Sequence, residues 1–413
     1  MVLEQVPVDP AGAAAGALGA AAIPVPGLDL AAAIPVPGLD LAAAHAALAE
    51  EIEAAVLRVL RSGHYILGPE VEAFEAEFAA YAGARHAIGV GNGLDALRLA
   101  LAAHDVGPGD EVVVPSHTYI ATWFAVSATG ARPVPVEVDP HTMTLDPRAV
   151  EASITPRTRA LLPVHMYGHP APMDGLLAIA GRHGLAVVED AAQAHGARLA
   201  GRGAGGFGST AGWSFYPVKN LGAAGDAGGV TTDDDEVARR VRVARNQGSS
   251  RRSEHEMVGS NSRLAPIQAA VLRVKLRHLD AWNARRRAIA ARYHAELAGT
   301  SLLLPAVADG VEHAWHQFVV RHPRRDALRA ALKGAGIETL VHYETPPHLQ
   351  PAYATLGLGR GAFPVAESIA AEGLSLPIDP LLEAAQVSAV IETIRGWDTT
   401  SSRGRGAPGS GER

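Results

Sequence analysis

The chain has no cysteine and very little lysine. With no cysteine among its 413 residues, it can form no disulfide, thiolate nucleophile or sulfur-ligated metal site. Of its 36 Lys and Arg residues, only Lys219, Lys275 and Lys333 are lysine. Arginine therefore serves wherever a positive charge alone is needed, and each lysine calls for its own explanation.

Long uncharged apolar runs and an excess of positive charge are also missing. The formal net charge of −7 predicts neither a nucleic acid nor an anionic membrane as a partner. No stretch approaches the ~20 apolar residues of a membrane helix. The Ala-rich first 33 residues lack a basic start and are interrupted by Pro24, Pro26 and Gly27, so no secretory signal is predicted. We expect a soluble cytoplasmic protein, as the absence of cysteine also favours.

An 11-residue repeat lies near the start of the chain. The segment "AAAIPVPGLDL" occupies residues 20–30 and recurs unchanged at 31–41. Only the second copy leads directly into a helical pattern, so residues 1–33 are predicted to be a disordered extension. The Gly/Ser/Arg-rich residues 398–413 are likewise predicted to be a disordered tail.

Between these ends, valine-rich apolar segments alternate with helical patterns. Examples are "EVVVPS", "RALLPVHMYG" and "LAVVED". This alternation predicts an α/β fold with a mostly parallel sheet, covered on both faces and binding ligands at the carboxyl ends of its strands. A long helical region at roughly 264–298 precedes a smaller α+β part. We therefore predict a large domain over 34–298 and a small C-terminal domain over 299–397.

Two features sit at predicted strand ends. In "GLAVVEDAAQAHGA", Glu189 and Asp190 stand where a strand stops; a helix cap or loop carboxylate is the commoner role for such an acid. In "GNGLDAL", Gly91 and Gly93 flank a strand-to-helix turn that could bind a phosphate, although tight turns need glycine in any case.

Lys219 lies within "SFYPVKNLGAAGDAGG". Unlike arginine, a lysine amine can lose its proton and form a Schiff base. A phosphate turn, an acid at a strand end and this lysine together suggest pyridoxal 5′-phosphate (PLP), which needs all three. Lys275 lies inside a predicted helix, and Lys333 lies at a helix end, where a cation suits the dipole.

The motifs "VVEDAAQAHGA", "SFYPVKNLGAAGDAGG", "NSRL", "HYETPPHLQPAY" and "LSLPIDP" resemble, in this order, those of DegT/DnrJ-type nucleotide-sugar aminotransferases. The resemblance covers roughly 34–397. It implies a PLP-dependent enzyme of fold type I, with a mostly parallel seven-stranded sheet. "GNGLDALRLAL" and "PSHTYIATWFAVS" most resemble the members that aminate C3 of dTDP-3-oxo-6-deoxyhexoses.

The resemblance also assigns roles to single residues. It makes Lys219 the lysine that holds the cofactor covalently, Asp190 the partner of the pyridine nitrogen, and Gln193 the partner of the ring hydroxyl. Other cofactor contacts are implied for the stacking Tyr119, for the phosphate-binding Ser214, Gly93 and Leu94, and for Asn261, which would reach the phosphate of a neighbouring subunit. The implied protein is a homodimer with shared sites.

Residues implied to contact the substrate are His342, Tyr343, Tyr216 and His165. An isolated His-Tyr pair is usually structural, and for an aromatic such as Tyr119 core packing is the ordinary role. His165 and His169 have an H-x3-H spacing, but no acidic third ligand is evident and no metal site is predicted. Val218, Gln247 and Glu344 depart from common family residues, which bears on the substrate pocket.

The resemblance implies transamination at C3 of a dTDP-3-oxo-6-deoxyhexose, with L-glutamate as donor and pyridoxamine 5′-phosphate as the intermediate form of the cofactor. One alternative is amination at C4 of a dTDP-4-oxo-6-deoxyhexose. Another is a regulatory protein that binds PLP without catalysis. Related sugar dehydratases carry His in place of the lysine, so Lys219 argues against that reaction.

Overall fold

The computed structural model describes residues 35–251 and 253–403. The predicted N-terminal extension, with the first copy of the repeat, lies outside this range. No helix in the described part of the chain combines the length and the apolar character needed to cross a membrane.

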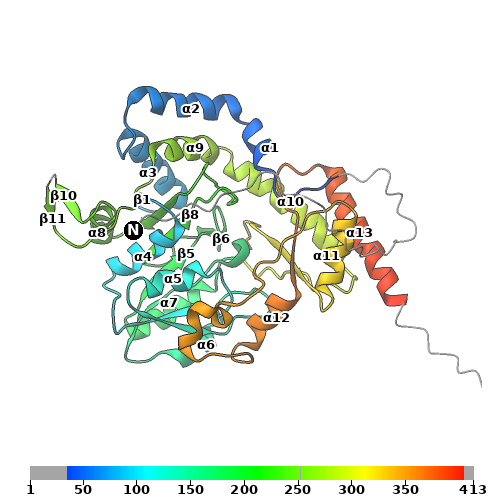
Figure 1. The fold of residues 1–413 in the computed structure, drawn as a ribbon. Coiled ribbons are helices and arrows are strands. Elements are labelled where there is room, and N and C mark those ends of the chain that lie inside the picture. Colours follow the sequence, from blue (N-terminus) through cyan, green and yellow to red (C-terminus); the bar gives the residue numbers. More distant parts are fainter. Residues whose placement is uncertain (1–34, 252, 404–413) are drawn as a thin grey trace, which may run out of the picture.

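A seven-stranded sheet forms the centre of the chain (Figure 1). Its strands are β1 (His86–Val90), β2 (Glu111–Pro115), β3 (Arg132–Val136), β4 (Thr158–Leu161), β5 (Ala186–Asp190), β8 (Thr210–Ser214) and β9 (Gly228–Thr232). They lie in the order β1-β9-β8-β5-β4-β2-β3, and β9 alone is antiparallel to its neighbours. The predicted mostly parallel sheet of seven strands is confirmed.

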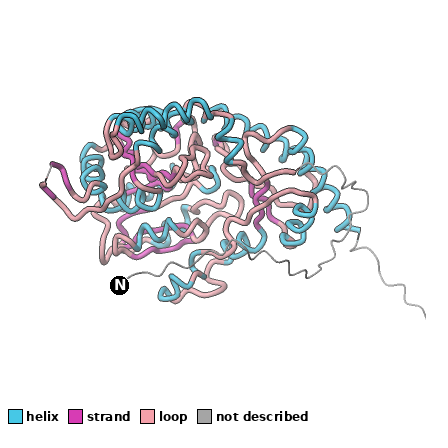
Figure 2. The backbone as a smooth tube through the Cα atoms, turned by 45° about the horizontal axis from the view of Figure 1, so that its top comes forward, coloured by secondary structure: helices cyan, strands magenta, loops and turns pink. Residues whose placement is uncertain are grey.

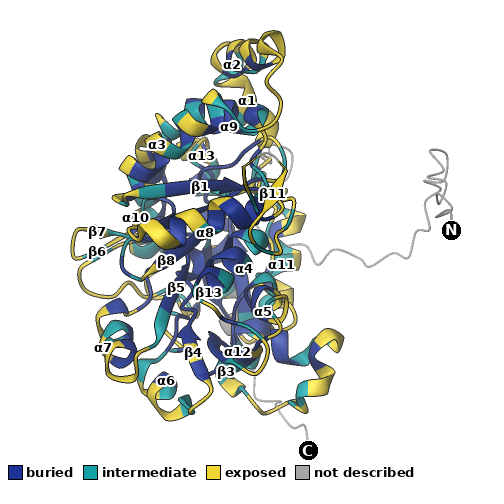
Figure 3. Cartoon of the chain, turned by 90° about the vertical axis from the view of Figure 1, so that its left-hand side faces the viewer, coloured by how far each residue is buried: buried dark blue, intermediate teal, exposed yellow. Residues whose placement is uncertain are grey.

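Helices cover both faces of the sheet, as Figure 2 shows. One face packs against α4 (Gly93–Ala103), α5 (Ala121–Ser127) and α8 (Asp235–Arg245). The other packs against α3 (Pro69–Ala82), α6 (Pro147–Ser153), α7 (Met173–His183) and α9 (Pro266–Leu276). The strands between them are buried along most of their length (Figure 3), which explains their continuous apolar runs.

The N-terminal helices are α1 (Leu41–Ala46) and α2 (Ala49–Ser62), and α2 packs on α9. Short elements complete the large domain: β6 (Arg198–Leu199), β7 (Arg202–Gly203), β10 (Ser249–Arg251), β11 (Glu254–His255) and the 3-10 turn η2 (Met166–Gly168). β12 (Val311–Glu312) pairs with β6.

A second core forms at the C-terminal end of the chain. Its elements are β13 (Phe318–Arg321), α11 (Arg325–Gly334), η3 (Pro347–Leu349), η4 (Pro351–Leu356), α12 (Pro364–Glu372), β14 (Gly373–Leu376) and α13 (Ala384–Arg403). The antiparallel β13 and β14 pack with α11, α13 and the end of α10 (Leu279–Leu297). Because Ile289 and Tyr293 of α10 belong to this second core, it begins before the predicted boundary at Gly299.

The structure differs from the predicted helices in two places. The helical region at 264–298 is two helices, since α9 ends at Leu276 and α10 begins at Leu279. The tail predicted from 398 is wrong for 398–403, because α13 continues to Arg403 and the Ser301 N–H donates to Asp398. Residues 404–413 lie outside the described residues.

Candidate active site

Asp190 ends β5 on the sheet face that carries α4 and α5. Its buried carboxylate accepts hydrogen bonds from Thr122 Oγ1 (2.8 Å) and from the Ala192 N–H (3.2 Å). Thr118 Oγ1 lies 2.8 Å from Thr122 Oγ1. Because Thr122 donates its only hydroxyl hydrogen to Asp190, Thr118 must donate to Thr122. Burial raises the pKa of Asp190, whereas the two hydrogen bonds and Lys219 lower it. Asp190 is thus a carboxylate held by two hydrogen bonds, and its oxygens can accept from a further donor.

Glu189 points to the opposite face, because successive side chains of a strand alternate. Its carboxylate is fully buried and accepts from the N–H groups of Gly205, Phe207 and Gly208 and from His165 Nε2. His165 Nδ1 in turn accepts from the Ala171 N–H, at 3.0 Å. Both ring nitrogens of His165 are therefore hydrogen-bonded inside the fold. This position disagrees with the predicted contact of His165 with the substrate.

Lys219 lies in the loop between β8 and β9. Its N–H donates to Tyr216 O (2.9 Å), closing a tight turn, and a Cβ at Gly222 would lie 2.2 Å from Pro217 O. Burial lowers the pKa of the Lys219 amine to about 8, opposed by the charge of Asp190. Because about half of the amine is uncharged near pH 8, it can act as a nucleophile or a base.

Three histidines surround this amine and stay uncharged. Burial, with a smaller contribution from the charge of Lys219, lowers the pKa of His195 to about 3 and that of His342 to about 4. The pKa of His316 is also well below its ordinary value for the same two reasons. Asp190 is the acid whose charge acts on Lys219.

Gln193 is held in one orientation. Its Oε1 accepts the Tyr167 N–H at 2.7 Å, and its Nε2 donates to Tyr343 Oη at 3.0 Å. Since an amide nitrogen carries two hydrogens, one remains for a further acceptor. The ring of Tyr343 lies 5.3 Å from that of Tyr119, and Tyr119 is 54% exposed. Tyr119 therefore lines the open site, and core packing does not describe it.

The start of α4 forms an anion cradle beside Ser214. Asn92 caps the helix by accepting from the Asp95 N–H at 2.8 Å. Among the described residues, the N–H groups of Gly93 and Leu94 have no acceptor, and the positive end of the helix dipole lies there. A Cβ at Gly93 would lie 2.6 Å from Ser214 Cβ, so glycine is required for the two to approach.

The remaining predicted residues are spread around this group. His342 bonds Ser375 Oγ at 2.8 Å and lines a small pocket of about 120 Å³ with Val218. Tyr216 and Asn261 are exposed. Ser262, beside Asn261, accepts the Gly91 N–H at 3.0 Å and so brings this segment next to the anion cradle of its own chain.

The comparisons with known proteins identify the family of the chain. The DegT/DnrJ/EryC1/StrS aminotransferase family matches residues 46–395. The chain belongs to this family. The dTDP-3-amino-3,4,6-trideoxy-alpha-D-glucose transaminase of Streptomyces venezuelae is 58% identical over 351 residues, covering 85% of this chain and 93% of that protein. The solved structure of S. venezuelae DesV in complex with a ketimine intermediate matches with a TM-score of 0.87 at 58% identity, covering 88% of this chain and 98% of that one.

A further relative carries a different kind of name. The erythromycin biosynthesis sensory transduction protein EryC1 of Saccharopolyspora erythraea is 57% identical over 349 residues, covering 84% of this chain and 95% of that protein. The predicted fold of PLP-dependent transferases of type I is confirmed by the match to aminotransferase structures and by the seven-stranded sheet.

The side chains in this family member's site fit PLP. An anionic phosphate suits the free N–H groups of Gly93 and Leu94 with Ser214. Asp190 has room for a pyridinium nitrogen, and the spare hydrogen of Gln193 suits a ring oxygen. The amine of Lys219 would supply the covalent link to the cofactor.

Reasoning from the sequence missed three residues that support the site. Thr122 bonds Asp190, Tyr167 donates to Gln193, and His117 Nε2 lies 2.8 Å from Tyr167 Oη. Tyr167 also donates to the carbonyl of His342. Thr122 stands within "PSHTYIATWFAVS", so its motif was visible although its contact was not.

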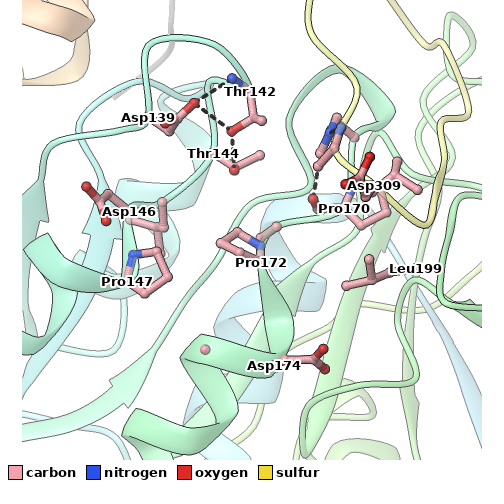
Figure 4. Close-up of a pocket in the computed structure, with 16 residues that line it drawn as sticks. Asp139, Thr142, Thr144, Asp146, Pro147, Pro170, Pro172, Asp174, Leu199 and Asp309 are labelled. Atoms are coloured by element: carbon pink, nitrogen blue, oxygen red, sulfur yellow. Dashed lines mark hydrogen bonds between the residues drawn. The ribbon is translucent and has the colours of Figure 1, made fainter.

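A larger cavity of about 380 Å³ has none of these residues in its lining (Figure 4). Asp139 on its wall accepts from Thr142, and His169 bonds Pro170 O and the Ala308 N–H. Across the described ranges, no three His, Cys, Asp or Glu side chains are grouped to hold a metal ion. The hydrogen bonds of Asp139 stabilise a local turn, whereas that of His169 with the Ala308 N–H joins two segments far apart in the sequence.

Proposed function

We propose that this chain is a PLP-dependent aminotransferase that moves the amino group of L-glutamate to C3 of a dTDP-3-oxo-6-deoxyhexose, in deoxyamino-sugar biosynthesis. The observation that carries the proposal is the Lys219 amine, whose pKa of about 8 accompanies a buried Asp190 and an oriented Gln193. The C3 position rests on the S. venezuelae relative, whose name specifies a 3-amino sugar.

When bound, PLP supplies a protonated ring that withdraws electrons from the reacting carbon. Asp190 would keep the ring nitrogen protonated if it remains ionised. Thr122 and the Ala192 N–H support that charge, against the burial that raises the pKa of Asp190. The remaining Nε2 hydrogen of Gln193 would donate to the ring oxygen.

Lys219 moves the proton in both half-reactions. Near pH 8 its Nζ is close to equally protonated and free, so it can take a proton in one direction and return it in the other. Tyr119, Tyr343 and His342 lie on the accessible side of the site, where the sugar would enter.

We further propose a cytoplasmic homodimer with shared sites, in which the exposed Asn261 reaches the neighbouring subunit's phosphate. Mixing Lys219→Ala with Asn261→Ala tests this arrangement. Each variant alone is inactive, but half the sites of a mixed dimer carry both native residues. Restored activity supports shared sites, and mixtures as inactive as their parents contradict them.

A regulatory PLP-binding protein is the second candidate, because the 57% identical relative is named a sensory transduction protein. Absorbance separates the two functions. The purified protein is expected to be yellow, and excess L-glutamate should shift that absorbance to the pyridoxamine form. A binding protein keeps its colour.

The position of amination is tested by the reverse shift. Adding a dTDP-3-oxo-6-deoxyhexose to the pyridoxamine form should restore the yellow colour. Restoration only by the 4-oxo isomer would establish the C4 alternative instead.

A further inference from the structure

Asn220, which follows Lys219, is the centre of a buried hydrogen-bond network. Its Nδ2 donates to Asn283 Oδ1 and to Ala314 O, both at 2.9 Å. Its Oδ1 lies 3.1 Å from His316 Nδ1. Asn220 and Asn283 are buried to 5% and 1% exposure, so these bonds are shielded from water.

This network joins Lys219 to three separate parts of the fold. Asn283 lies on α10, and its Nδ2 donates to His195 O at 2.8 Å in the loop after β5. The Ala314 N–H donates to Gly168 O at 3.0 Å, next to Tyr167, which holds Gln193. A continuous series of bonds thus connects the Lys219 loop with the residue that orients Gln193.

The network also determines the tautomer of His316. Because Asn220 Nδ2 is the donor to two acceptors, its Oδ1 must accept, and His316 Nδ1 must carry the hydrogen. The Nε2 of this uncharged ring is then a bare acceptor. His316 lines the same small pocket as His342 and Val218.

We propose that Asn220 is a positioning residue for Lys219: its amide fixes the Lys219 loop against α10 and residues 314–316 and so holds the amine in place within the site. The inference rests on the proposed role of Lys219. Asp190 is the charged group that acts on the amine, and His195, His316 and His342 are the titratable groups whose pKa the charge of Lys219 lowers; Lys275, Arg286 and Asp379 share a pocket of about 50 Å³ with Lys219.

The test measures the ionisation of Lys219 in the full-length, cofactor-free chain. Amines are labelled with acetic anhydride across pH 6–11, and mass spectrometry gives the extent at each lysine. With three lysines in the chain, the exposed Lys333 is an internal reference. The wild-type midpoint for Lys219 is expected near 8.

Asn220→Ala should move that midpoint upward, because water enters around a loosened amine. A rise of one pH unit lowers the uncharged fraction at pH 8 about fivefold, and labelling of Lys219 relative to Lys333 falls with it. His316→Asn, which can keep a donor to Asn220, should leave the midpoint closer to wild type. If Asn220→Ala fails to fold, Asn283→Ala removes one partner and carries the same prediction with a smaller shift.

Thr231→Ala is the matched control. Thr231 is buried and bonds Trp213 Nε1 at 2.8 Å, so its loss should lower thermal stability without moving the Lys219 midpoint. An Asn220→Ala protein with lower stability and an unchanged midpoint would overturn the proposal. Labelling needs neither sugar nor donor, so a chain that transfers no nitrogen can still pass or fail this test.

Discussion

The two acids that end β5 are neighbours in sequence and meet opposite surroundings. On one side, the carboxylate of Glu189 accepts from three backbone N–H groups and from His165. We call this the closed side. On the other, the open side, Asp190 accepts from Thr122 and Ala192 and acts on the amine of Lys219.

The difference shows how a buried carboxylate becomes available for chemistry. A carboxylate whose acceptor positions are filled by the fold contributes to stability, since each bond offsets desolvation. A carboxylate with free acceptor positions can still bind a ligand. The raised pKa of Asp190 shows that its hydrogen bonds do not fully offset its burial. The open side should therefore govern activity and the closed side stability.

The largest expected effect is at Lys219. Lys219→Arg keeps a positive charge but cannot give up its proton, so turnover should fall by at least ~1000-fold with the fold intact. Initial rates and circular dichroism provide the measurements. Lys333→Arg, at an exposed position, is the control and should retain wild-type rates. Near-native turnover of Lys219→Arg would show that the open side has been misassigned.

Exchanging each acid of the pair for its amide compares the two sides directly. Asp190→Asn should lower kcat/KM by roughly 100- to 1000-fold, because an uncharged amide cannot keep the ring nitrogen protonated. The same change should raise the melting temperature of the cofactor-free protein at neutral pH, where a buried charge is removed. Glu189→Gln should have the opposite effect on stability and lower it by ~1–3 kcal/mol, because a buried donor is left unsatisfied.

Equal effects of the two changes on both activity and stability would contradict the comparison. Thermal unfolding and steady-state rates of both variants, measured under one set of conditions, decide the point.

Thr122 should have a smaller effect that depends on pH. Its hydrogen bond lowers the pKa of Asp190, so Thr122→Val should raise that pKa. Because Asp190 acts when ionised, the acid limb of kcat/KM should move to higher pH, with about a tenfold loss below it. Thr122→Ser restores the hydroxyl and should restore the profile. An unchanged pH profile of kcat/KM in Thr122→Val would show that Thr122 does not support the ionised Asp190.

The smallest effect on catalysis is expected at His165. His165→Gln can still donate to Glu189 but loses the acceptor for Ala171, so stability should fall by ~1–3 kcal/mol. The KM for the sugar should remain unchanged. A selective rise in that KM would support the contact between His165 and the substrate that the sequence motif predicted.

The alternation of valine-rich strands and helices was enough to predict the sheet, and the scarcity of lysine with the motif around Lys219 was the reason to predict a reactive amine there. Neither could separate Glu189 from Asp190 by environment, because the donors of Glu189 come from residues 205–208 and from His165. The same limit applies to Thr122 and Tyr167, whose contacts depend on how distant loops meet. The break between α9 and α10 was hidden because both helices continue one apolar pattern.

The most direct measurement follows the nitrogen itself. The protein is incubated with L-[15N]glutamate and a dTDP-3-oxo-6-deoxyhexose, and NMR locates the label in the sugar. The account predicts 15N bonded to C3 with the wild-type protein and none with Lys219→Arg. A yellow, folded protein that leaves all the label in glutamate, or that places it at C4, would contradict it.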